Sequence, residues 1–198
     1  MIPFVYPSAP HRRRHGPAGY AQYERYRPWL RDEFAFRCVY CLTREQWGVV
    51  RATYHLDHFR AQVHQPHAAR DYDNLLYACA ACNIAKGDAD VPDPCTCMLD
   101  GHVTVDEQGR MHGTTPDARR VIAKLGLDAP DYCEFRMLWI SIVQLAATCD
   151  PHLFRLLMKY PDDLPDLSVL RPPRNTRPQG VNESFRARRD RGQLPETY

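Results

Sequence analysis

The chain has 198 residues, of which 44% are hydrophobic and 25% charged, the usual balance for a globular protein large enough to build its own core. No apolar run approaches the ~20 residues needed to cross a membrane. The first residues are broken by proline and lack the apolar segment of a secretory signal. These features argue against a membrane-spanning or secreted protein, and we expect a cytoplasmic chain with no membrane partner.

The net charge of +2 is distributed unevenly along the chain. Residues 1–37 hold seven arginines against three acidic residues, residues 171–198 hold the same numbers, and residues 38–170 hold twelve basic and eighteen acidic residues. Basic ends around an acidic centre are typical of arms that grip a polyanion around a cation site, although each end could equally be a solvated tail. The arginines predicted to contact a nucleic-acid backbone are Arg12, Arg13, Arg14, Arg186, Arg188 and Arg189.

The N-terminal third is predicted to contain an arm, a short helix and a strand. Residues 1–19 are rich in proline, arginine and histidine and predict an arm without regular structure. Tyrosines three residues apart over 20–26 predict a short helix that Pro28 ends or restarts, with its rings packed against the following module or, as the alternative, stacked on bases. Branched residues over 48–54 predict a strand that leads into residues 55–59.

The middle of the chain is predicted to form a loop and then a helix. Residues 60–73 carry histidines, proline and aspartate and read as a loop. Asp73 or Asn74 can cap a helix, which we expect to run over 75–86 and to end at Gly87.

A small hairpin and three helices are expected after residue 90. A turn over 106–109 between two short apolar runs predicts the hairpin. The signals that bound the helices are Thr115 to Gly126 for the first, a capping box of Asp131 and Glu134 for the second, and Asp150 for the third. The second helix carries an apolar stripe that we expect to be buried: Leu138, Trp139, Ile142, Leu145 and Ala146.

Two Cys-x-x-Cys pairs flank the predicted strand. In the reducing cytoplasm such pairs indicate metal ligands before disulfides. Each pair brings two sulfurs to one ion, so Cys38, Cys41, Cys79 and Cys82 together suit a closed, structural Zn²⁺ site. The alternative is four buried free thiols.

Three polar residues between and beside these pairs suit phosphodiester chemistry. Asp57 and His58 are adjacent, so their side chains diverge, and the carboxylate can hold a metal while the imidazole acts on water. The amide oxygen of Asn83 could complete an oxygen-rich site for a hard cation, Mg²⁺ or Mn²⁺. His58 would then deprotonate the attacking water while the cation stabilises charge on the phosphate.

The order Cys-x-x-Cys, Asp-His, Asn-Leu, Cys-x-x-Cys-Asn, x-x-Lys resembles the HNH endonuclease family, in the subgroup with a four-cysteine zinc site. The resemblance implies an α+β fold with a ββα-metal core, here extended by a hairpin, C-terminal helices and basic ends. It implies metal ligation by Asp57 and Asn83, a general base at His58, a loop-orienting role for Asn74 and a phosphate-side position for Lys86. It also implies that the four cysteines bind zinc. Ala61 departs from the family, which often has proline there.

This interpretation divides the chain into four segments: an N-terminal arm with a short helix, the HNH nuclease module, a hairpin with supporting helices, and a Pro/Arg-rich tail that lies over the domain or stays mobile. Their boundaries are 1–36, 37–90, 91–160 and 161–198.

The function predicted from these residues is a metal-dependent DNA endonuclease. The alternatives are a non-catalytic, zinc-stabilised module that binds nucleic acid, and a nuclease for RNA or branched DNA. The sequence leaves the oligomeric state open, and His55 could be a third metal ligand, a phosphate contact or a packing residue. The other residues without a settled role are His64, His67, Cys95 and Cys97, the two cysteines being expected as free thiols.

Overall fold

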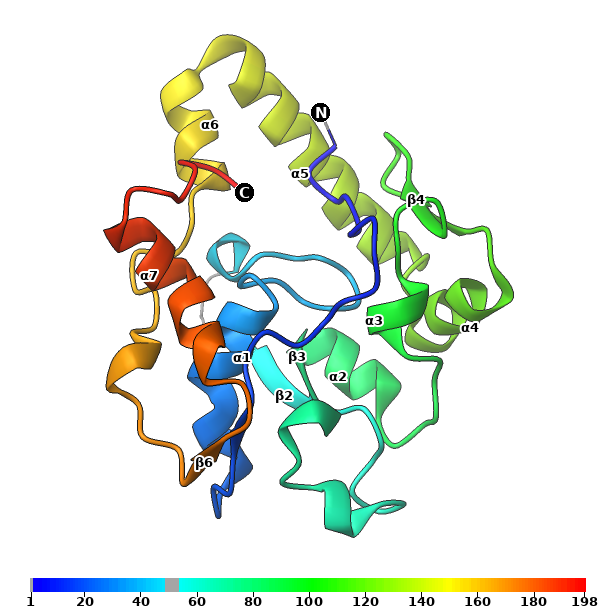
Figure 1. The fold of residues 1–198 in the computed structure, drawn as a ribbon. Coiled ribbons are helices and arrows are strands. Elements are labelled where there is room, and N and C mark those ends of the chain that lie inside the picture. Colours follow the sequence, from blue (N-terminus) through cyan, green and yellow to red (C-terminus); the bar gives the residue numbers. More distant parts are fainter. Residues whose placement is uncertain (1, 49–53) are drawn as a thin grey trace.

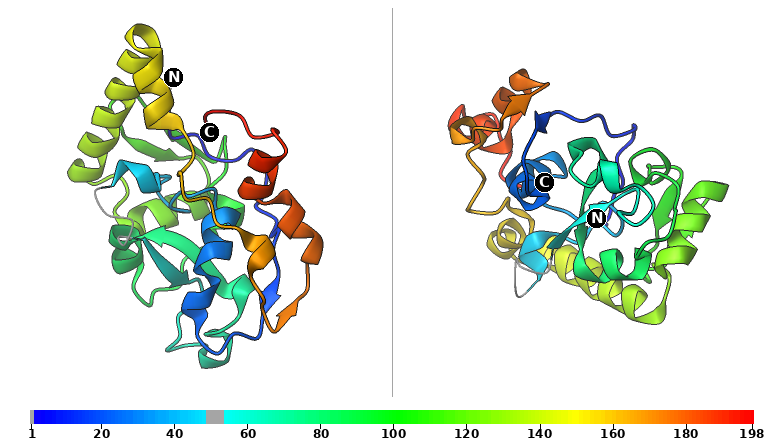
Figure 2. Two further views of the ribbon diagram at one scale, coloured as in Figure 1. Left: turned by 90° about the vertical axis from the view of Figure 1, so that its left-hand side faces the viewer. Right: turned by 90° about the horizontal axis from the view of Figure 1, so that it is seen from below.

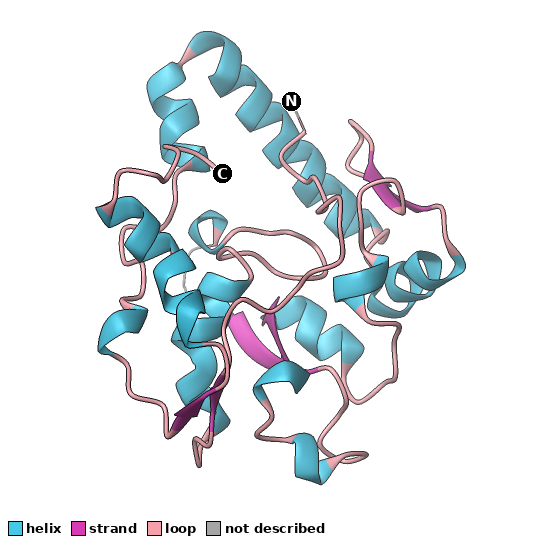
Figure 3. Cartoon of the chain, in the orientation of Figure 1, coloured by secondary structure: helices cyan, strands magenta, loops and turns pink. Residues whose placement is uncertain are grey.

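The computed structural model describes residues 2–48 and 54–198, which form a mixed α+β fold (Figure 1). Within these ranges the strands form three two-stranded antiparallel sheets, β1–β6, β2–β3 and β4–β5 (Figure 3). The strands are β1 Pro17–Ala18, β2 Tyr54–His58, β3 Leu75–Cys79, β4 Val103–Val105, β5 Met111–Gly113 and β6 Arg174–Asn175. The helices are α1 Arg27–Glu33, α2 Ala80–Lys86, α3 Pro94–Cys97, α4 Pro116–Leu125, α5 Pro130–Cys149, α6 Pro151–Met158 and α7 Phe185–Asp190.

The centre of the molecule is a ββα unit made of β2, β3 and α2. Strands β2 and β3 pair over their full lengths, with Tyr54 opposite Cys79 and His58 opposite Leu75. Helix α2 follows β3 without a loop and ends at Gly87, whose φ of 57° suits glycine. The predicted end of this helix is confirmed.

The predicted start of this helix is wrong, because residues 75–79 are a strand. Leu75, Leu76, Tyr77 and Ala78 are all buried. A four-residue run with buried side chains on both sides suits a central strand as well as a helix, and pairing with β2 selects the strand. Helix α2 therefore begins only at Ala80.

The strand predicted over 48–54 cannot be compared in full, since residues 49–53 lie outside the described residues. The described strand β2 starts at Tyr54 and contains the whole His-Leu-Asp-His run. Its alternation places His55 and Asp57 on one face of the strand and Leu56 and His58 on the other.

The N-terminal region packs onto the ββα unit. A 3₁₀ turn over Tyr23–Tyr26 leads into α1, which Pro28 opens, as the sequence predicts. Tyr26, Trp29 and Leu30 are fully buried. The arm before them has no helix, and its short strand β1 pairs with β6 from the other end of the chain.

The C-terminal region contains the predicted hairpin, β4–β5, and the three predicted helices, α4, α5 and α6. Helix α5 packs antiparallel against α6 at the top of the molecule in Figure 1. The predicted capping box is wrong: the N-cap residue of α5 is Ala129 and not Asp131, so the helix starts at Pro130, two residues earlier than predicted. Proline fits the first turn of a helix because that N–H has no intrahelical partner.

The apolar stripe predicted to be buried on α5 is largely exposed. Leu138 and Leu145 are 53% and 65% exposed, whereas Ala146 is buried as expected, on the side of the helix that also carries Ile140 and Val143. Because α5 is apolar on most sides, its periodicity does not identify the face that packs. Trp139 does pack, since its ring stacks on Trp47 with centroids 4.4 Å apart.

The C-terminal tail lies over the domain (Figure 2). The carbonyl oxygen of Tyr198 accepts a hydrogen bond from the buried Arg44, and the Tyr198 ring stacks on Tyr160 at 4.3 Å. Phe185 of α7 packs against Phe36. In the described part of the chain, no helix is both long and apolar enough to span a membrane.

Candidate functional site

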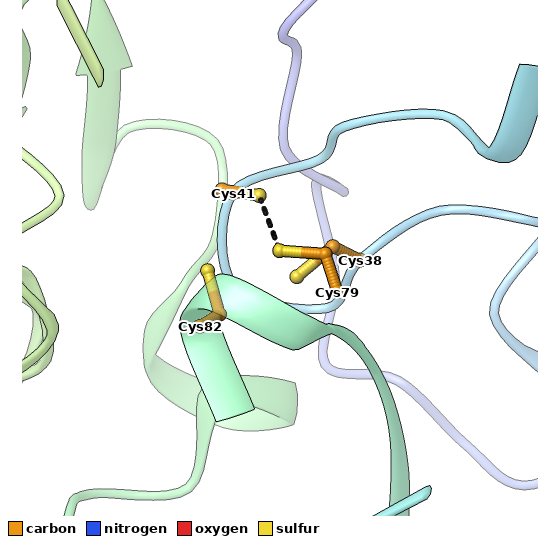
Figure 4. A group of neighbouring side chains, drawn as sticks. All are labelled: Cys38, Cys41, Cys79 and Cys82. Atoms are coloured by element: carbon orange, nitrogen blue, oxygen red, sulfur yellow. Dashed lines mark hydrogen bonds between the residues drawn. The ribbon is translucent and has the colours of Figure 1, made fainter. Parts of the chain in front are cut away.

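Four cysteines converge where the loop after α1 meets the junction of β3 and α2 (Figure 4). The sulfurs of Cys38, Cys41, Cys79 and Cys82 all lie within 4.8 Å of one another, and the Sγ atoms of Cys41 and Cys79 are 3.7 Å apart. A tetrahedral Zn²⁺ with bonds of about 2.3 Å spaces its sulfurs about 3.8 Å apart. The donor set and its spacing are therefore compatible with zinc.

Local backbone geometry closes the first Cys-x-x-Cys turn. Leu42 adopts a left-handed φ of 58°, and its N–H donates to the carbonyl of Cys38. Hydrogen bonds from the other three thiols, led by Cys38, hold the pKa of Cys41 well below its ordinary value. Burial raises the pKa of Cys38, and hydrogen bonds from the other three thiols raise that of Cys82, so Cys41 is the member shifted toward the thiolate, the form that binds metal.

A second site lies beside this cluster, in an open pocket of about 430 Å³. Asp57, His58 and Asn83 all line it, together with Tyr23 and Gln62. The fold thus brings together the carboxylate, the imidazole and the amide that the sequence nominates. Two come from β2 and one from α2, so the ββα unit itself builds the pocket.

The His58 ring is fixed from two sides. Its Nε2 lies 2.9 Å from the carbonyl oxygen of Ala69, and the ring of Tyr23 packs edge-on against it with centroids 4.7 Å apart. A carbonyl only accepts hydrogen bonds, so this contact requires the proton on Nε2 and leaves Nδ1 as the basic nitrogen. The amide nitrogen of Gln62 lies 2.8 Å from Nε2 and 3.3 Å from Nδ1, so in this tautomer its N–H can donate to Nδ1 but not to the protonated Nε2.

Asn74 ties both ends of the loop that orients His58. Its Oδ1 accepts from the N–H of Arg60 at 2.8 Å, and its Nδ2 donates to the carbonyls of Arg60 and Ala68 at 3.1 and 3.2 Å. Ala68 directly precedes Ala69, whose carbonyl contacts the His58 ring. Asn74 therefore acts on the pocket through the loop and does not line it.

The carboxylate of Asp57 is held at both oxygens. The Tyr40 hydroxyl donates to Oδ2 at 2.6 Å, and the Lys86 ammonium donates to Oδ1 at 2.9 Å. Asp57 is only 3% exposed. Burial, and then the charge of Asp57, raise the pKa of Tyr40 well above its ordinary value, so the phenol stays protonated as a donor.

Lys86 does not occupy the phosphate-side position that we expected. Its ammonium is buried and also donates to the carbonyls of His58 and Gly87, at 2.7 and 3.5 Å. With the bond to Asp57, all three protons have acceptors inside the protein. Lys86 thus neutralises and orients the carboxylate behind the pocket.

Asn83 faces His55 across the site. The Asn83 amide nitrogen lies 3.1 Å from His55 Nδ1, and its amide oxygen accepts no hydrogen bond within the described residues. Each Asp57 oxygen keeps a second lone pair beyond its one donor. A carboxylate and a free amide oxygen suit a hard divalent cation that keeps part of its water shell.

The other predicted residues lie away from the pocket. His64 and His67 are exposed in the loop. Cys95 and Cys97 join no cluster of metal ligands among the described residues, and burial raises their pKa values to about 12 and about 11. These values keep both thiols protonated at neutral pH, as expected for free cysteines.

The arginines predicted to contact nucleic acid divide into two groups. Arg13 and Arg14 bind groups of the protein itself: Arg13 donates to the carbonyl of Leu75 at 2.5 Å, and Arg14 pairs with Asp32 at 3.1 Å. Arg12 is exposed. Among those of the tail, Arg186 pairs with Asp190, Arg188 lies over the Phe185 ring, and Arg189 donates to the carbonyl of Asp162.

Sequence reasoning missed four polar residues at the site: Tyr23, Tyr40, Gln62 and Asp88. Tyr23 packs against the following module, as its spacing predicts, and its partner there is the His58 ring. Tyr40 stands inside the first Cys-x-x-Cys, and nothing in that motif indicates that its hydroxyl reaches Asp57. Only the position of Gln62, four residues after His58, offered a signal.

Comparison with known proteins gives one match. Residues 38–89 match the family model described as HNH endonuclease, a range that contains both cysteine pairs and Asp57, His58 and Asn83. Searches of the curated proteins and of the solved structures gave no match. The matched range suggests a nuclease-type function.

Proposed function

We propose that this chain is a metal-dependent nuclease that hydrolyses phosphodiester bonds in DNA. The observation that carries the proposal is the pocket in which His58, Asp57 and Asn83 meet, with the imidazole fixed through Nε2. A module that only binds nucleic acid has no need of an oriented imidazole beside two oxygen donors. The HNH match over the same residues supports this interpretation.

His58 acts as the general base in this proposal. With its proton on Nε2 and donated to Ala69, the ring presents Nδ1 to a water molecule in the pocket. Nδ1 removes a proton as the water attacks phosphorus, which is the usual task of a positioned imidazole. Tyr23 and the Asn74-bound loop keep the ring in this orientation.

Asp57 and Asn83 hold the divalent cation, Mg²⁺ or Mn²⁺. When bound, such a cation stabilises the negative charge that grows on the phosphate and on the leaving oxygen. Asp57 supplies the negative charge for binding, and Asn83 supplies a neutral oxygen that is free to coordinate. Lys86 and Tyr40 orient the carboxylate from behind.

The four cysteines hold a structural Zn²⁺ that is separate from this chemistry. They use four protein ligands and leave no open position, as structural zinc sites do. Their task is to join the loop at residues 38–41 to the start of α2.

Arg12 and the arginines of α7 are the available contacts for the phosphate backbone in this proposal. Such contacts strengthen binding without selecting a base sequence, and their contribution falls as salt rises. Arg13 and Arg14 bind partly buried or buried groups of the protein, whereas the hydrogen bonds of Arg186 and Arg189 lie at the exposed surface, so we do not assign Arg13 and Arg14 to DNA.

Plasmid cleavage with Mg²⁺ tests the proposal through His58→Ala. The variant should lose about 10²-fold or more in kcat, the usual contribution of a general base. It should keep its zinc, because the cysteines do not contact His58. His64→Ala is the matched control, since it removes an exposed histidine from the same loop and should cut at the wild-type rate.

Equal cutting by wild type and His58→Ala would contradict the assigned base. Salt-sensitive DNA binding without cleavage under Mg²⁺ or Mn²⁺ would instead support the non-catalytic zinc module. A parallel panel of duplex, single-stranded and branched DNA and of RNA decides the substrate class.

A further inference from the structure

We infer that Tyr40 is a positioning residue that fixes the Asp57 carboxylate for binding of the divalent cation and ties its orientation to the four-cysteine cluster. The inference rests on the proposed role of Asp57 as a metal ligand. It adds a residue outside that ligand set and a physical link between the two metal sites.

The geometry at Asp57 supports this role. Tyr40 is fully buried, and its hydroxyl lies 2.6 Å from Oδ2, while Lys86 holds Oδ1. Two donors on opposite oxygens fix the plane of the carboxylate, which otherwise rotates freely about its last torsion. The remaining lone pairs of the two Asp57 oxygens then point in fixed directions, so the carboxylate loses less conformational freedom when a cation binds.

The position of Tyr40 depends on the cysteine cluster. Tyr40 stands between Cys38 and Cys41, so closing that turn around a metal sets the direction of its side chain. The same turn is anchored to β3, because Val39 N–H donates to the carbonyl of Tyr77 at 2.9 Å. The Tyr40 side chain thus connects the cysteine cluster directly to Asp57 of β2.

A simpler explanation is that Tyr40 only fills the core and its hydroxyl pairs with the nearest acceptor. The protein contains a comparison for this explanation. Tyr77 is also buried, and its hydroxyl also lies 2.6 Å from a carboxylate, that of Glu45, which does not line the pocket. If burial alone matters, losing either hydroxyl should have the same effects.

The experiment compares Tyr40→Phe with Tyr77→Phe in zinc-loaded protein. Both variants keep the ring and lose one hydroxyl bonded to a buried carboxylate. Binding of Mn²⁺ is measured by electron paramagnetic resonance, with Asp57→Ala defining the signal that belongs to the pocket. Zinc content and thermal unfolding are measured on the same samples.

We expect Tyr40→Phe to weaken Mn²⁺ binding about 10- to 100-fold, the usual effect of losing a group that orients a metal ligand. Tyr77→Phe should bind Mn²⁺ as wild type does, and both should keep one zinc. The cleavage rate at saturating Mn²⁺ should recover in Tyr40→Phe more than at low Mn²⁺, which a purely structural defect would not produce.

Wild-type Mn²⁺ affinity in Tyr40→Phe, or an equal loss in Tyr77→Phe, would overturn the inference and leave the proposed function standing. Unchanged Mn²⁺ binding in Asp57→Ala would instead show that Asp57 is not a metal ligand, which would contradict both the inference and the proposed function. If Mn²⁺ binding depends on Asp57 and Tyr40 but no substrate is cut, the inference holds and the nuclease proposal fails.

Discussion

The environment of Asp57 shows how single residues shape this site. A buried carboxylate is costly unless it is paired and hydrogen-bonded. Tyr40 supplies a neutral donor and Lys86 a positive one, so the carboxylate is paired and oriented without closing the pocket. Lys86 has its own acceptors, and the pair behaves as one unit.

Lys86→Met tests this pairing. Methionine keeps much of the side-chain volume but leaves the Asp57 charge without its cation, and removing one partner of a buried pair costs about 3–5 kcal/mol. We expect a loss of unfolding free energy of that order in urea. Lys124→Met, at an exposed position in α4, is the matched control and should change stability by less than about 0.5 kcal/mol. A control-sized effect at Lys86 would show that the pair contributes little.

At the scale of elements, the ββα unit is small and depends on its neighbours. Strands β2 and β3 are five residues each and α2 is seven, too short for any of them to be stable alone. The cysteine cluster joins the loop after α1 to the start of α2, where Cys79 is the N-cap residue and its side chain makes no capping hydrogen bond. A zinc ion there would replace the missing cap as the anchor.

Removal of zinc should therefore loosen α2 and the first cysteine turn together. We expect a strong chelator to lower the midpoint of thermal unfolding and to abolish Mn²⁺ binding in the pocket. Omitting Mg²⁺ should leave the midpoint nearly unchanged, because the pocket cation joins residues that β2–β3 and α2 already hold in place. An unchanged midpoint after confirmed zinc loss would contradict a structural zinc site.

At the scale of the whole molecule, the two ends of the chain are part of the fold. The arm docks on α1, where the buried Glu33 accepts hydrogen bonds from the backbone of Arg14 and His15 at 2.8 and 3.0 Å and pairs with His11. The tail docks on the arm through β1–β6. At Gly180 a Cβ would overlap the Arg14 carbonyl, so only glycine permits that approach.

This docking predicts a pH dependence of stability. Burial alone raises the pKa of Glu33, but the hydrogen bond from His11 and those from the backbone of Arg14 and His15 outweigh it and lower the pKa to about 2. Because the folded pKa is lower than the unfolded value near 4.5, the stabilisation is complete above about pH 4.5. It is lost as the pH falls towards 2.

Urea unfolding from pH 7 to pH 3 should show this loss in the wild type. Glu33→Gln should be less stable at pH 7 and should show a flatter slope below pH 4.5. Glu107→Gln, which changes an exposed carboxylate in the hairpin turn, serves as the control and should keep the wild-type slope. Identical slopes in all three proteins would exclude Glu33 as the source.

The sequence by itself identified the residues that the fold gathers at the cysteine cluster and in the pocket. Cysteine pairs, the Asp-His dyad and Asn83 are specific because metal ligation and proton transfer need particular atoms at short spacings. The sequence also determined several helix ends. Pro28 lies in the first turn of α1, and Gly87 and Gly126 follow the last residues of α2 and α4, because each of these residue types constrains the backbone locally.

Only the tertiary structure decided which elements form between those breaks and which way the side chains face. Residues 75–79 form a strand because they pair with β2. Helix α5 buries Ile140 and Val143 because that side of the helix faces the rest of the protein. Tyr40 met Asp57, and Lys86 turned inward, through contacts between residues 17 and 29 positions apart. Such contacts depend on how the whole chain packs, which local spacing does not encode.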